Sequence, residues 1–263
     1  RRTGILSVTA FKVAIPARYA SSRLPGKPLI DLGGKPMIQH VYERAVESGA
    51  EEIVIATDDQ RIYDVAEGFG AEVCMTSAEH HSGSDRLAEL VDFCGWSDDT
   101  IVVNLQGDEP LTPSSILLQA ARGLDEHPEA GISTLCAPIS SASQLYDPHT
   151  VKVVRNQQGF ALYFSRAPIP WERDALDVEA HPEHNQAFRH IGLYAYRAGY
   201  LREYSRSEPC DLEQIERLEQ LRALWQGVKI FVDVAEQLPG HGVDTPEDVE
   251  TVTALLKQYE NKS

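Results

Sequence analysis

Residues Phe11–Ile30 read FKVAIPARYASSRLPGKPLI and join a short apolar run to a loop rich in Arg, Ser, Pro and Gly. The run Phe11–Pro16 has the apolar, partly β-branched composition of a buried strand. Beyond the loop, apolar residues recur at helical spacing from Pro36 to Ser48, and Gly49 ends this segment. The pattern predicts a strand, a loop and a helix in succession, which is the start of a βαβ unit.

The same alternation of strands and helices continues through the first half of the chain. It is typical of a mostly parallel central sheet flanked by helices, so we predict an α/β fold. The expected strands are Glu52–Thr57, Ala71–Thr76 and Thr100–Leu105, and the expected helices are Gln60–Phe69, Asp85–Cys94 and a segment that begins at Pro113.

The chain changes character after Gly131 and becomes richer in strands. Two runs, Val151–Val154 and Phe160–Ser165, flank a turn that Gly159 closes, which predicts a hairpin. We expect one domain over residues 10–263 with an embedded β-rich lobe at 139–205, and we expect residues 1–9 to be a tag or disordered. The other expected elements are a polar loop at Pro168–Phe188, a strand at His190–Arg197, one helix at Leu212–Trp225, a strand at Lys229–Val234 and a helix from Pro246.

Composition and charge restrict the class of protein. Of the 263 residues, 42% are hydrophobic and 24% are charged, as in globular proteins. The 40 Asp and Glu residues outnumber the 24 Lys and Arg residues, and the net charge of −16 argues against nucleic acid or an anionic membrane as the main partner. We recognise no signal peptide and no apolar run long enough to span a membrane, and the four scattered cysteines are typical of reduced thiols. We therefore expect a cytoplasmic protein.

Positive charge is concentrated in the loop after the first strand, which contains Arg18, Arg23, Lys27 and Lys35 together with Ser22. Ligands of an open α/β sheet bind at the carboxyl ends of its strands, so this loop could wrap a phosphate chain. Its spacing is not that of a P-loop. The alternative is an ordinary solvated loop.

Two aspartates follow strands at the same edge of the predicted sheet. Asp108 lies in the run NLQGDEP at Asn104–Pro110, where Gly107 permits a close backbone approach, and Asp244 precedes the last helix. A carboxylate at each place could hold Mg²⁺ that bridges phosphates. The alternatives are a β-turn at Asp108 and helix capping at Asp244.

Two weaker clusters lie in the second half of the chain. Arg166, Arg173, Arg189 and His190 could bind a substrate carboxylate, or could be surface residues. In the expected helix at 212–225, three glutamates at a spacing of three avoid the leucine stripe, which is typical of a solvated face. These are Glu213, Glu216 and Glu219, with Gln220 beside the last.

Taken together, the motifs resemble the 3-deoxy-manno-octulosonate cytidylyltransferase (CMP-Kdo synthetase) family. The resemblance covers nearly the whole chain from Phe11 onward. It is carried by IPARYASSRLPGKPL at Ile15–Leu29, ATDD at Ala56–Asp59, SGSDRLAE at Ser82–Glu89, VNLQGDEP at Val103–Pro110, ALYFSRAPIPW at Ala161–Trp171, RHIGLYAYR at Arg189–Arg197, LEQLRALW at Leu218–Trp225 and GVDTPED at Gly242–Asp248.

The resemblance implies a nucleotide-sugar transferase-like fold, a homodimer formed through the β-rich lobe, and a Mg²⁺-dependent reaction. That reaction transfers CMP from CTP to the anomeric hydroxyl of 3-deoxy-D-manno-octulosonate (Kdo) and releases pyrophosphate, in lipopolysaccharide core synthesis. By the same resemblance, the triphosphate would be bound by Arg18, Ser22, Arg23 and Lys27, and the cytosine and ribose by Thr57, Ser84, Asp85 and Gln106. Magnesium would be held by Asp108 and Asp244, and the sugar by Arg166, Arg173, His190, Glu219 and Gln220. The catalytic set would be Arg18, Lys27, Asp108 and Asp244.

Three other functions share parts of this pattern. A cytidylyltransferase for another sugar acid, such as an 8-amino Kdo analogue or sialic acid, would change only the acceptor. A catalytically silent nucleotide sensor would have lost a metal carboxylate, whereas Asp108 and Asp244 are both present. A phosphate hydrolase would need a base that activates water, and no residue of the sequence stands out for that role.

Overall fold

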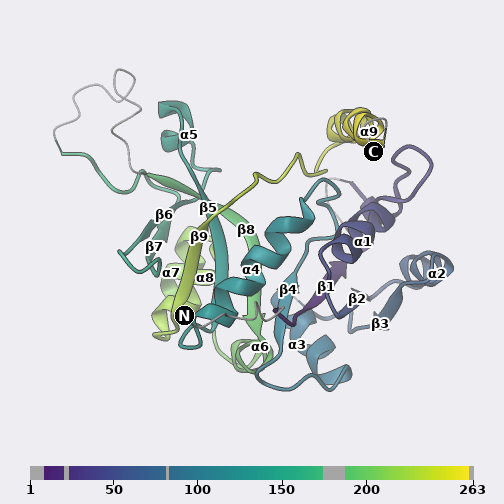
Figure 1. The fold of residues 1–263 in the computed structure, drawn as a ribbon, viewed down its shortest axis with the longest axis horizontal. Helices are drawn as coiled ribbons and strands as arrows, with labels where there is room; N and C mark the ends of the chain where they lie inside the picture. The colour runs from purple at the N-terminus through teal and green to yellow at the C-terminus, as the bar shows by residue number, and fades with distance from the viewer. Residues whose placement is uncertain (1–8, 21–23, 81–82, 174–186, 261–263) are drawn as a thin grey trace, which may run out of the picture.

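A single twisted sheet organises the protein, whose computed structural model describes residues 9–20, 24–80, 83–173 and 187–260 (Figure 1). Its strands are β1 (Lys12–Ala17), β2 (Glu52–Thr57), β3 (Glu72–Met75), β4 (Ile101–Asn104), β5 (Ile132–Pro138), β6 (Lys152–Arg155), β7 (Ala161–Ser165), β8 (Phe188–Arg197) and β9 (Ile230–Val234). The main path runs β3-β2-β1-β4-β8-β5-β9, and β6 joins the edge of β8 and pairs with β7. Only β8 on the main path is antiparallel to its neighbours, so the predicted mostly parallel α/β fold is confirmed.

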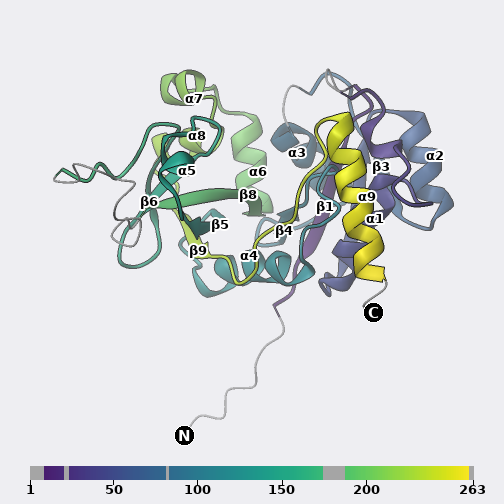
Figure 2. The ribbon, with the colours of Figure 1, turned by 90° about the horizontal axis from the view of Figure 1, so that it is seen from above.

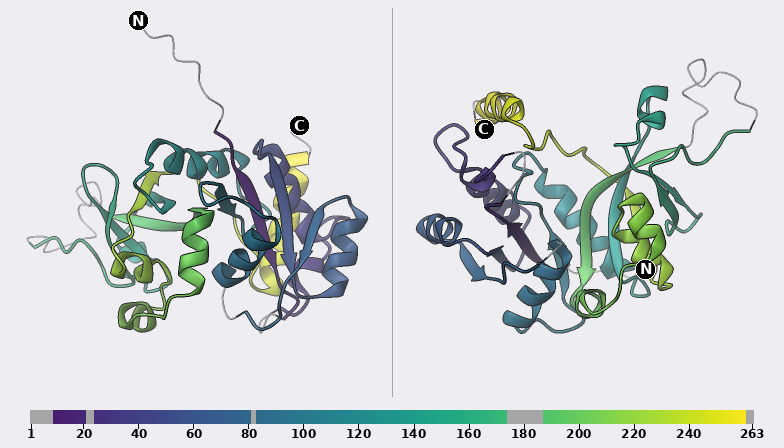
Figure 3. Two further views of the ribbon diagram at one scale, coloured as in Figure 1. Left: turned by 90° about the horizontal axis from the view of Figure 1, so that it is seen from below. Right: turned by 180° about the vertical axis from the view of Figure 1, so that it is seen from behind.

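Helices cover both faces of the sheet (Figures 1 and 3). One face packs against α1, α2 and α4, and the other against α3, α6 and α8. In the described part of the chain, no helix combines the length and the apolar character needed to cross a bilayer. The helices are α1 (Met37–Glu47), α2 (Gln60–Gly68), α3 (Gly83–Phe93), α4 (Ser114–Glu126), α5 (Ala142–Tyr146), α6 (Ala198–Ser205), α7 (Asp211–Glu216), α8 (Gln220–Trp225) and α9 (Pro246–Glu260), with a short 3-10 helix η1 (Lys27–Leu29).

Strand β1 shows why its sequence is an unbroken apolar run. Val13 and Ile15 are fully buried against the α1, α2 and α4 side, while Ala14 is fully buried against the α3 side. Successive side chains of a strand point to opposite faces, and here both faces are covered. The strands and helices predicted for the first half of the chain are therefore confirmed to within a few residues.

The second half departs from the sequence prediction in two places. The strand β5 and the helices α5 and α6 were not anticipated, and β5 pairs with β8 and β9 inside the main sheet. The single helix expected at Leu212–Trp225 is wrong, because the chain breaks between α7 and α8 at Arg217, whose φ of 56° is left-handed. The hairpin is confirmed: β6 and β7 pair antiparallel, and Gly159 closes the turn with a φ of 87°.

The last helix lies far from the strand that precedes it (Figures 1 and 2). Residues 235–245 leave β9 and cross to the other side of the molecule, where α9 lies beside α1. There Val243 and Val252 form a small core with Leu32 and Met37. The Val243 N–H also donates to the Asp108 carbonyl oxygen at 2.9 Å, so this crossing brings residue 244 to the ends of β1 and β4.

The end of β4 approaches β1 so closely that only glycine fits at residue 107. A Cβ added to Gly107 would lie 2.8 Å from the carbonyl oxygen of Pro16, a contact that needs the backbone to shift. Because Asp108 follows directly, this close approach also sets where the Asp108 carboxylate lies.

We predict that Gly107→Ala lowers the free energy of unfolding by about 1–3 kcal/mol, the usual cost of overpacking a rigid site. Urea denaturation measures this change. Gly68→Ala is the matched control, because a Cβ at the end of α2 meets nothing within 4 Å and alanine favours the helix. Wild-type stability in the Gly107→Ala protein would contradict the steric account.

Candidate functional site

Two adjoining pockets open where β1 and β4 end. The first, here called the charged pocket, has a volume of about 430 Å³ and is lined by Arg18, Lys27, Asp108 and Asp244 among others. The second, the tyrosine pocket, has a volume of about 300 Å³. Gln106 and Gly83 line both, so the two pockets share a wall at the carboxyl end of β4.

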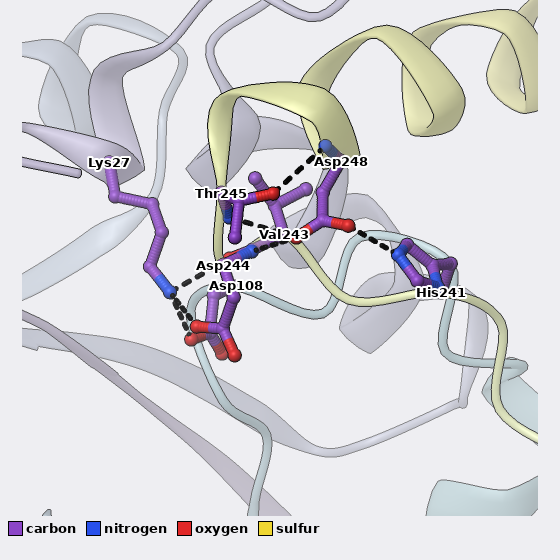
Figure 4. Close-up of polar contacts among 7 residues, drawn as sticks. All are labelled: Lys27, Asp108, His241, Val243, Asp244, Thr245 and Asp248. Carbon is purple, nitrogen blue, oxygen red and sulfur yellow. Dashed lines mark hydrogen bonds and ion pairs between the residues drawn. The ribbon is translucent and has the colours of Figure 1, made fainter. Parts of the chain in front are cut away.

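Lys27 draws the two predicted metal ligands together (Figure 4). Its Nζ lies 2.6 Å from Asp108 Oδ2 and 3.0 Å from Asp244 Oδ1, and it donates to the Val243 carbonyl oxygen at 2.8 Å. Partial burial opposes the charge on Lys27, but its hydrogen bonds to Asp108 and Asp244 outweigh this effect and raise its pKa. Lys27 lies in η1, Asp108 follows β4 and Asp244 precedes α9, so the three side chains meet only in the folded chain.

Asp248 fixes the loop that carries Asp244. Its Oδ2 accepts hydrogen bonds from the N–H groups of Asp244 at 2.9 Å and Thr245 at 2.8 Å, while Oδ1 lies 2.5 Å from His241 Nε2 (Figure 4). These contacts lower the pKa of Asp248, with the bond to His241 as the largest cause. Thr245 and Asp248 thus form a capping box at the start of α9, which leaves the Asp244 side chain available to the pocket.

The other predicted phosphate ligands divide into three groups. Arg18 lines the charged pocket and donates from Nη2 to the His80 carbonyl oxygen at 2.8 Å; burial and the nearby Arg86 lower its pKa. Lys35 lies elsewhere and pairs with Glu43 at 2.8 Å. Ser22 and Arg23 lie outside the described residues.

The carboxylate of Glu109, the residue after Asp108, has a different partner from that of Asp108. Its carboxylate accepts a hydrogen bond from Thr112 Oγ1 at 3.0 Å, and burial raises its pKa. Of the two acidic residues in the NLQGDEP run, Asp108 is therefore the one whose carboxylate contacts Lys27.

Four tyrosines line the tyrosine pocket, and the sequence analysis did not identify them. Tyr194 and Tyr196 come from β8, Tyr200 and Tyr204 from α6. Neighbouring rings lie with centroids 5.7, 6.4 and 6.0 Å apart along this series. Their spacing was the available signal: two residues apart in a strand, then four apart in a helix, each of which places side chains on one face.

Two buried polar atoms of this pocket have no hydrogen-bond partner in the described part of the chain. They are Asn104 Oδ1, at the end of β4, and Tyr200 Oη. Buried polar groups are nearly always satisfied in folded proteins. Together with the aromatic walls, these atoms give the pocket the character of a binding site for a polar ligand with hydroxyl groups.

The break between α7 and α8 places Glu219 and Gln220 on this pocket. Glu219 Oε2 accepts a hydrogen bond from Ser84 Oγ at 3.0 Å and lies 3.5 Å from Tyr204 Oη. Enclosure by protein on the pocket wall raises the pKa of Glu219, although the residue as a whole keeps contact with solvent through the pocket mouth.

The solvated glutamate face expected for residues 212–225 is wrong. Glu213 is buried, and both its oxygens bind Arg222 at 2.6 Å, whereas Ile215 of the expected apolar stripe is 77% exposed. Glu216 accepts hydrogen bonds from Ser165 Oγ at 2.7 Å and from the Arg166 N–H at 2.8 Å. The left-handed Arg217 interrupts the helical register between α7 and α8. The bonds of Glu213 and Glu216 hold the chain in place around this interruption.

The remaining predicted sugar and base ligands lie in different settings. His190 is half-buried with its Nε2 2.9 Å from Thr134 Oγ1, and loss of solvent around the ring lowers its pKa to about 3, so it is neutral at physiological pH. Arg166 donates to the carbonyl oxygens of Glu216 at 2.7 Å and Pro148 at 2.9 Å. Three further residues complete the set: Arg173 is exposed, Thr57 is fully buried with its carbonyl bound to Thr76, and Asp85 lies in the first turn of α3.

The donor set of the charged pocket fits a magnesium ion that is completed by substrate. No group of three or more His, Cys, Asp or Glu side chains within the described ranges is arranged to hold a metal by itself. Asp108 and Asp244 nonetheless converge on one cation, Lys27 Nζ. Mg²⁺ commonly takes one or two carboxylates and obtains its other ligands from phosphates and water.

The chain is similar to known cytidylyltransferases over most of its length. The family model for cytidylyltransferases matches residues 13–230. A curated 3-deoxy-manno-octulosonate cytidylyltransferase from Thioalkalivibrio sulfidiphilus (strain HL-EbGR7) is 61% identical over 248 residues, which cover 94% of this chain and 99% of the relative. The chain belongs to the 3-deoxy-manno-octulosonate cytidylyltransferase family.

Solved structures agree with the fold of this cytidylyltransferase. A CMP:2-keto-3-deoxy-manno-octonic acid synthetase complexed with CTP is 44% identical, superposes with a TM-score of 0.87, and matches over 95% of this chain and 99% of the other. A cytidylyltransferase from Leptospira borgpetersenii serovar Hardjo-bovis (strain JB197) is 18% identical with a TM-score of 0.63, over 95% and 87% of the two chains, and supports the fold alone.

We predict that Glu219→Gln makes the cytidylyltransferase more stable at neutral pH. The folded state raises the Glu219 pKa above its ordinary value of 4.5, so the ionised carboxylate destabilises the fold once the pH exceeds that value. The gain should grow as the pH rises above 4.5 and vanish in more acidic solution. Thermal melts of both proteins across this range measure it; a gain that is independent of pH would contradict the ionisation account.

Proposed function

We propose that this protein transfers CMP from CTP to the anomeric hydroxyl of Kdo and releases pyrophosphate. The observation that carries this proposal is the pair of pockets that share Gln106 and Gly83, one built for phosphates and a cation and the other for a polar, hydroxylated ligand. The 61% identical relative is named for this activity, and the 44% identical structure was solved with CTP.

The charged pocket supplies positioning and charge neutralisation. Arg18 and Lys27 bind the triphosphate, and Asp108 and Asp244 hold Mg²⁺, which when bound neutralises phosphate charge. Transfer at phosphorus needs little covalent participation from a protein, so the main requirement is to hold the acceptor hydroxyl in line with the leaving pyrophosphate. The shared wall at Gln106 lies between the two reactants.

The tyrosine pocket holds the acceptor. Glu219, Gln220 and Asn104 offer hydrogen bonds to sugar hydroxyls, and the tyrosine rings exclude water from the reacting groups. His190 is neutral, so it acts as a neutral hydrogen-bonding group and does not neutralise the sugar carboxylate. Arg173, and Arg166 if it leaves its present carbonyl partners, are the candidates for that role.

The cellular setting is part of the proposal. Four free thiols fit the reducing cytoplasm, where CTP is at hand, and the product would serve lipopolysaccharide core synthesis. Another sugar acid, such as an 8-amino Kdo analogue or sialic acid, is the alternative acceptor, and a competition assay among these acids scored by the CMP-sugar formed distinguishes them.

The decisive measurement is pyrophosphate release with CTP, UTP or GTP, each with and without Kdo, in Mg²⁺ and in chelator. The proposal expects release only with CTP, Kdo and Mg²⁺ together. Release from CTP without an acceptor would indicate a hydrolase, and no release under any condition would indicate a nucleotide-binding module.

In the same assay we predict that Asp108→Asn lowers turnover by orders of magnitude, because it removes a charge that the metal requires. Glu109→Gln is the matched control: its carboxylate faces Thr112, and its loss should change turnover far less. Circular dichroism checks that both variants keep the fold. Unchanged turnover in Asp108→Asn would exclude Asp108 from the mechanism.

We further propose that two copies associate through the β-rich lobe. Four large apolar side chains of the lobe and of the α7–α8 region beside it are exposed by 60–77%: Leu162, Trp171, Ile215 and Trp225. We predict that sedimentation finds a dimer that Trp225→Glu dissociates, because a carboxylate would be buried at the interface. Val46→Glu, on α1, which packs against β1, β2 and α4, and 52% exposed, should leave the dimer intact. A wild-type monomer would contradict the proposal.

A further inference from the structure

The ammonium of Lys27 occupies a position that has the donor chemistry of a metal site. Three oxygens surround it, from the Asp108 and Asp244 carboxylates and the Val243 carbonyl, at 2.6, 3.0 and 2.8 Å (Figure 4). An ammonium has three N–H donors, so its hydrogen-bonding capacity is matched by these acceptors. Carboxylate and carbonyl oxygens are also the ligands that hard divalent cations take.

We infer that Lys27 is an internal counter-ion that a divalent cation displaces. Before metal and nucleotide bind, its ammonium neutralises Asp108 and Asp244; when they bind, it leaves the carboxylates and pairs with the incoming phosphates. The inference rests on the magnesium site of the proposed function, and adds that the site is occupied in advance by the chain's own cation.

Electrostatics makes the two occupants mutually exclusive. An ammonium and a divalent cation that both touched the same two carboxylates would repel each other strongly at a partly buried site, and the Lys27 side chain is only 12% exposed. Without any cation, the two carboxylates would in turn repel one another. Exchange keeps every charge paired: the metal takes the carboxylates, and the displaced ammonium takes phosphate oxygens.

The local backbone permits this exchange without a larger movement. Gly26, directly before Lys27, is left-handed with a φ of 71°, donates its N–H to the Tyr19 carbonyl oxygen at 2.9 Å, and lies against the Tyr19 ring, which an added Cβ would meet at 3.0 Å. The Lys27 main chain is thus held, while its side chain has four rotatable methylene groups. The adjoining space of about 430 Å³ extends from Lys27 to Arg18 and Ala20, where the ammonium can move.

The consequence is that metal and nucleotide bind cooperatively. A metal that binds alone must displace the ammonium and leave it without phosphates to pair with, so its affinity in the absence of nucleotide is reduced. Removal of the ammonium should therefore strengthen metal binding to the nucleotide-free protein, even as it weakens binding of the triphosphate.

The test is a titration of the nucleotide-free protein with Mn²⁺, followed by electron paramagnetic resonance, for the wild type and Lys27→Met. We expect Lys27→Met to bind Mn²⁺ on the order of tenfold more tightly. This change in affinity lies between those expected for the loss of an exposed and of a buried ion pair. Lys35→Met is the matched control: this lysine lies in the same loop but pairs with Glu43, so its loss should leave Mn²⁺ affinity unchanged.

Thermal melts give a second measurement. Loss of the ammonium removes the cation that contacts both Asp108 and Asp244, so the metal-free Lys27→Met protein should melt below the wild type and gain more from added Mg²⁺. Should that variant fail to fold, Lys27→Gln keeps hydrogen-bond donors without the charge and should show the same direction of change.

The outcomes separate the inference from the proposed function. Equal Mn²⁺ affinity in the wild type and Lys27→Met, with loss of binding in Asp108→Asn, would overturn the inference and leave the metal site standing. An absence of saturable binding in both Lys27 variants would also overturn it. If in addition no binding were seen in the wild type with CTP present, the proposed metal site itself would be excluded.

Discussion

Two aspartate carboxylates that face each other across a pocket need a cation between them, and this requirement links three distant parts of the chain. Lys27, Asp108 and Asp244 are far apart in sequence, yet the Lys27 Nζ contacts the other two segments through both carboxylates and the Val243 carbonyl. The ammonium therefore contributes to stability as well as to chemistry. It joins the loop after β1, the end of β4 and the segment before α9.

The fold supplies this meeting point through two constraints on the backbone. The close approach at Gly107 sets the end of β4 against Pro16, and the crossing of residues 235–245 carries Asp244 over the sheet. Asp248 then orients the loop by accepting hydrogen bonds from two of its backbone N–H groups. A strongly acidic chain can in this way bind anionic substrates, because the backbone places Arg18 and Lys27 together at one edge of the sheet.

Local sequence rules were sufficient where burial and periodicity coincide. The first half of the sheet, the hairpin that Gly159 closes, and the meeting of the basic loop with Asp108 all followed from short apolar runs and from the rule that parallel strands end at one edge. The expectation that Asp244 also lies at a neighbouring strand end is wrong, because β9 is at the far edge of the sheet and Asp244 reaches the site through the crossing of residues 235–245. Strand β5 was missed because its burial depends on pairing with β8 and β9, which lie far away in sequence. The tyrosine pocket was missed because its wall is shared by the strand β8 and the helix α6, and the sequence prediction did not include α6.

The error at residues 212–225 is the most informative, because it shows where function opposes local propensity. A continuous helix would satisfy the leucine stripe and leave the glutamates in water; instead Arg217 takes a left-handed conformation, which is unfavourable for a residue other than glycine. The buried Glu213–Arg222 pair and the bonds of Glu216 hold the chain in this shape. The result is that a carboxylate, Glu219, and an amide, Gln220, line the tyrosine pocket. No periodicity in the sequence encodes that arrangement, since it depends on partners that only the folded chain brings together.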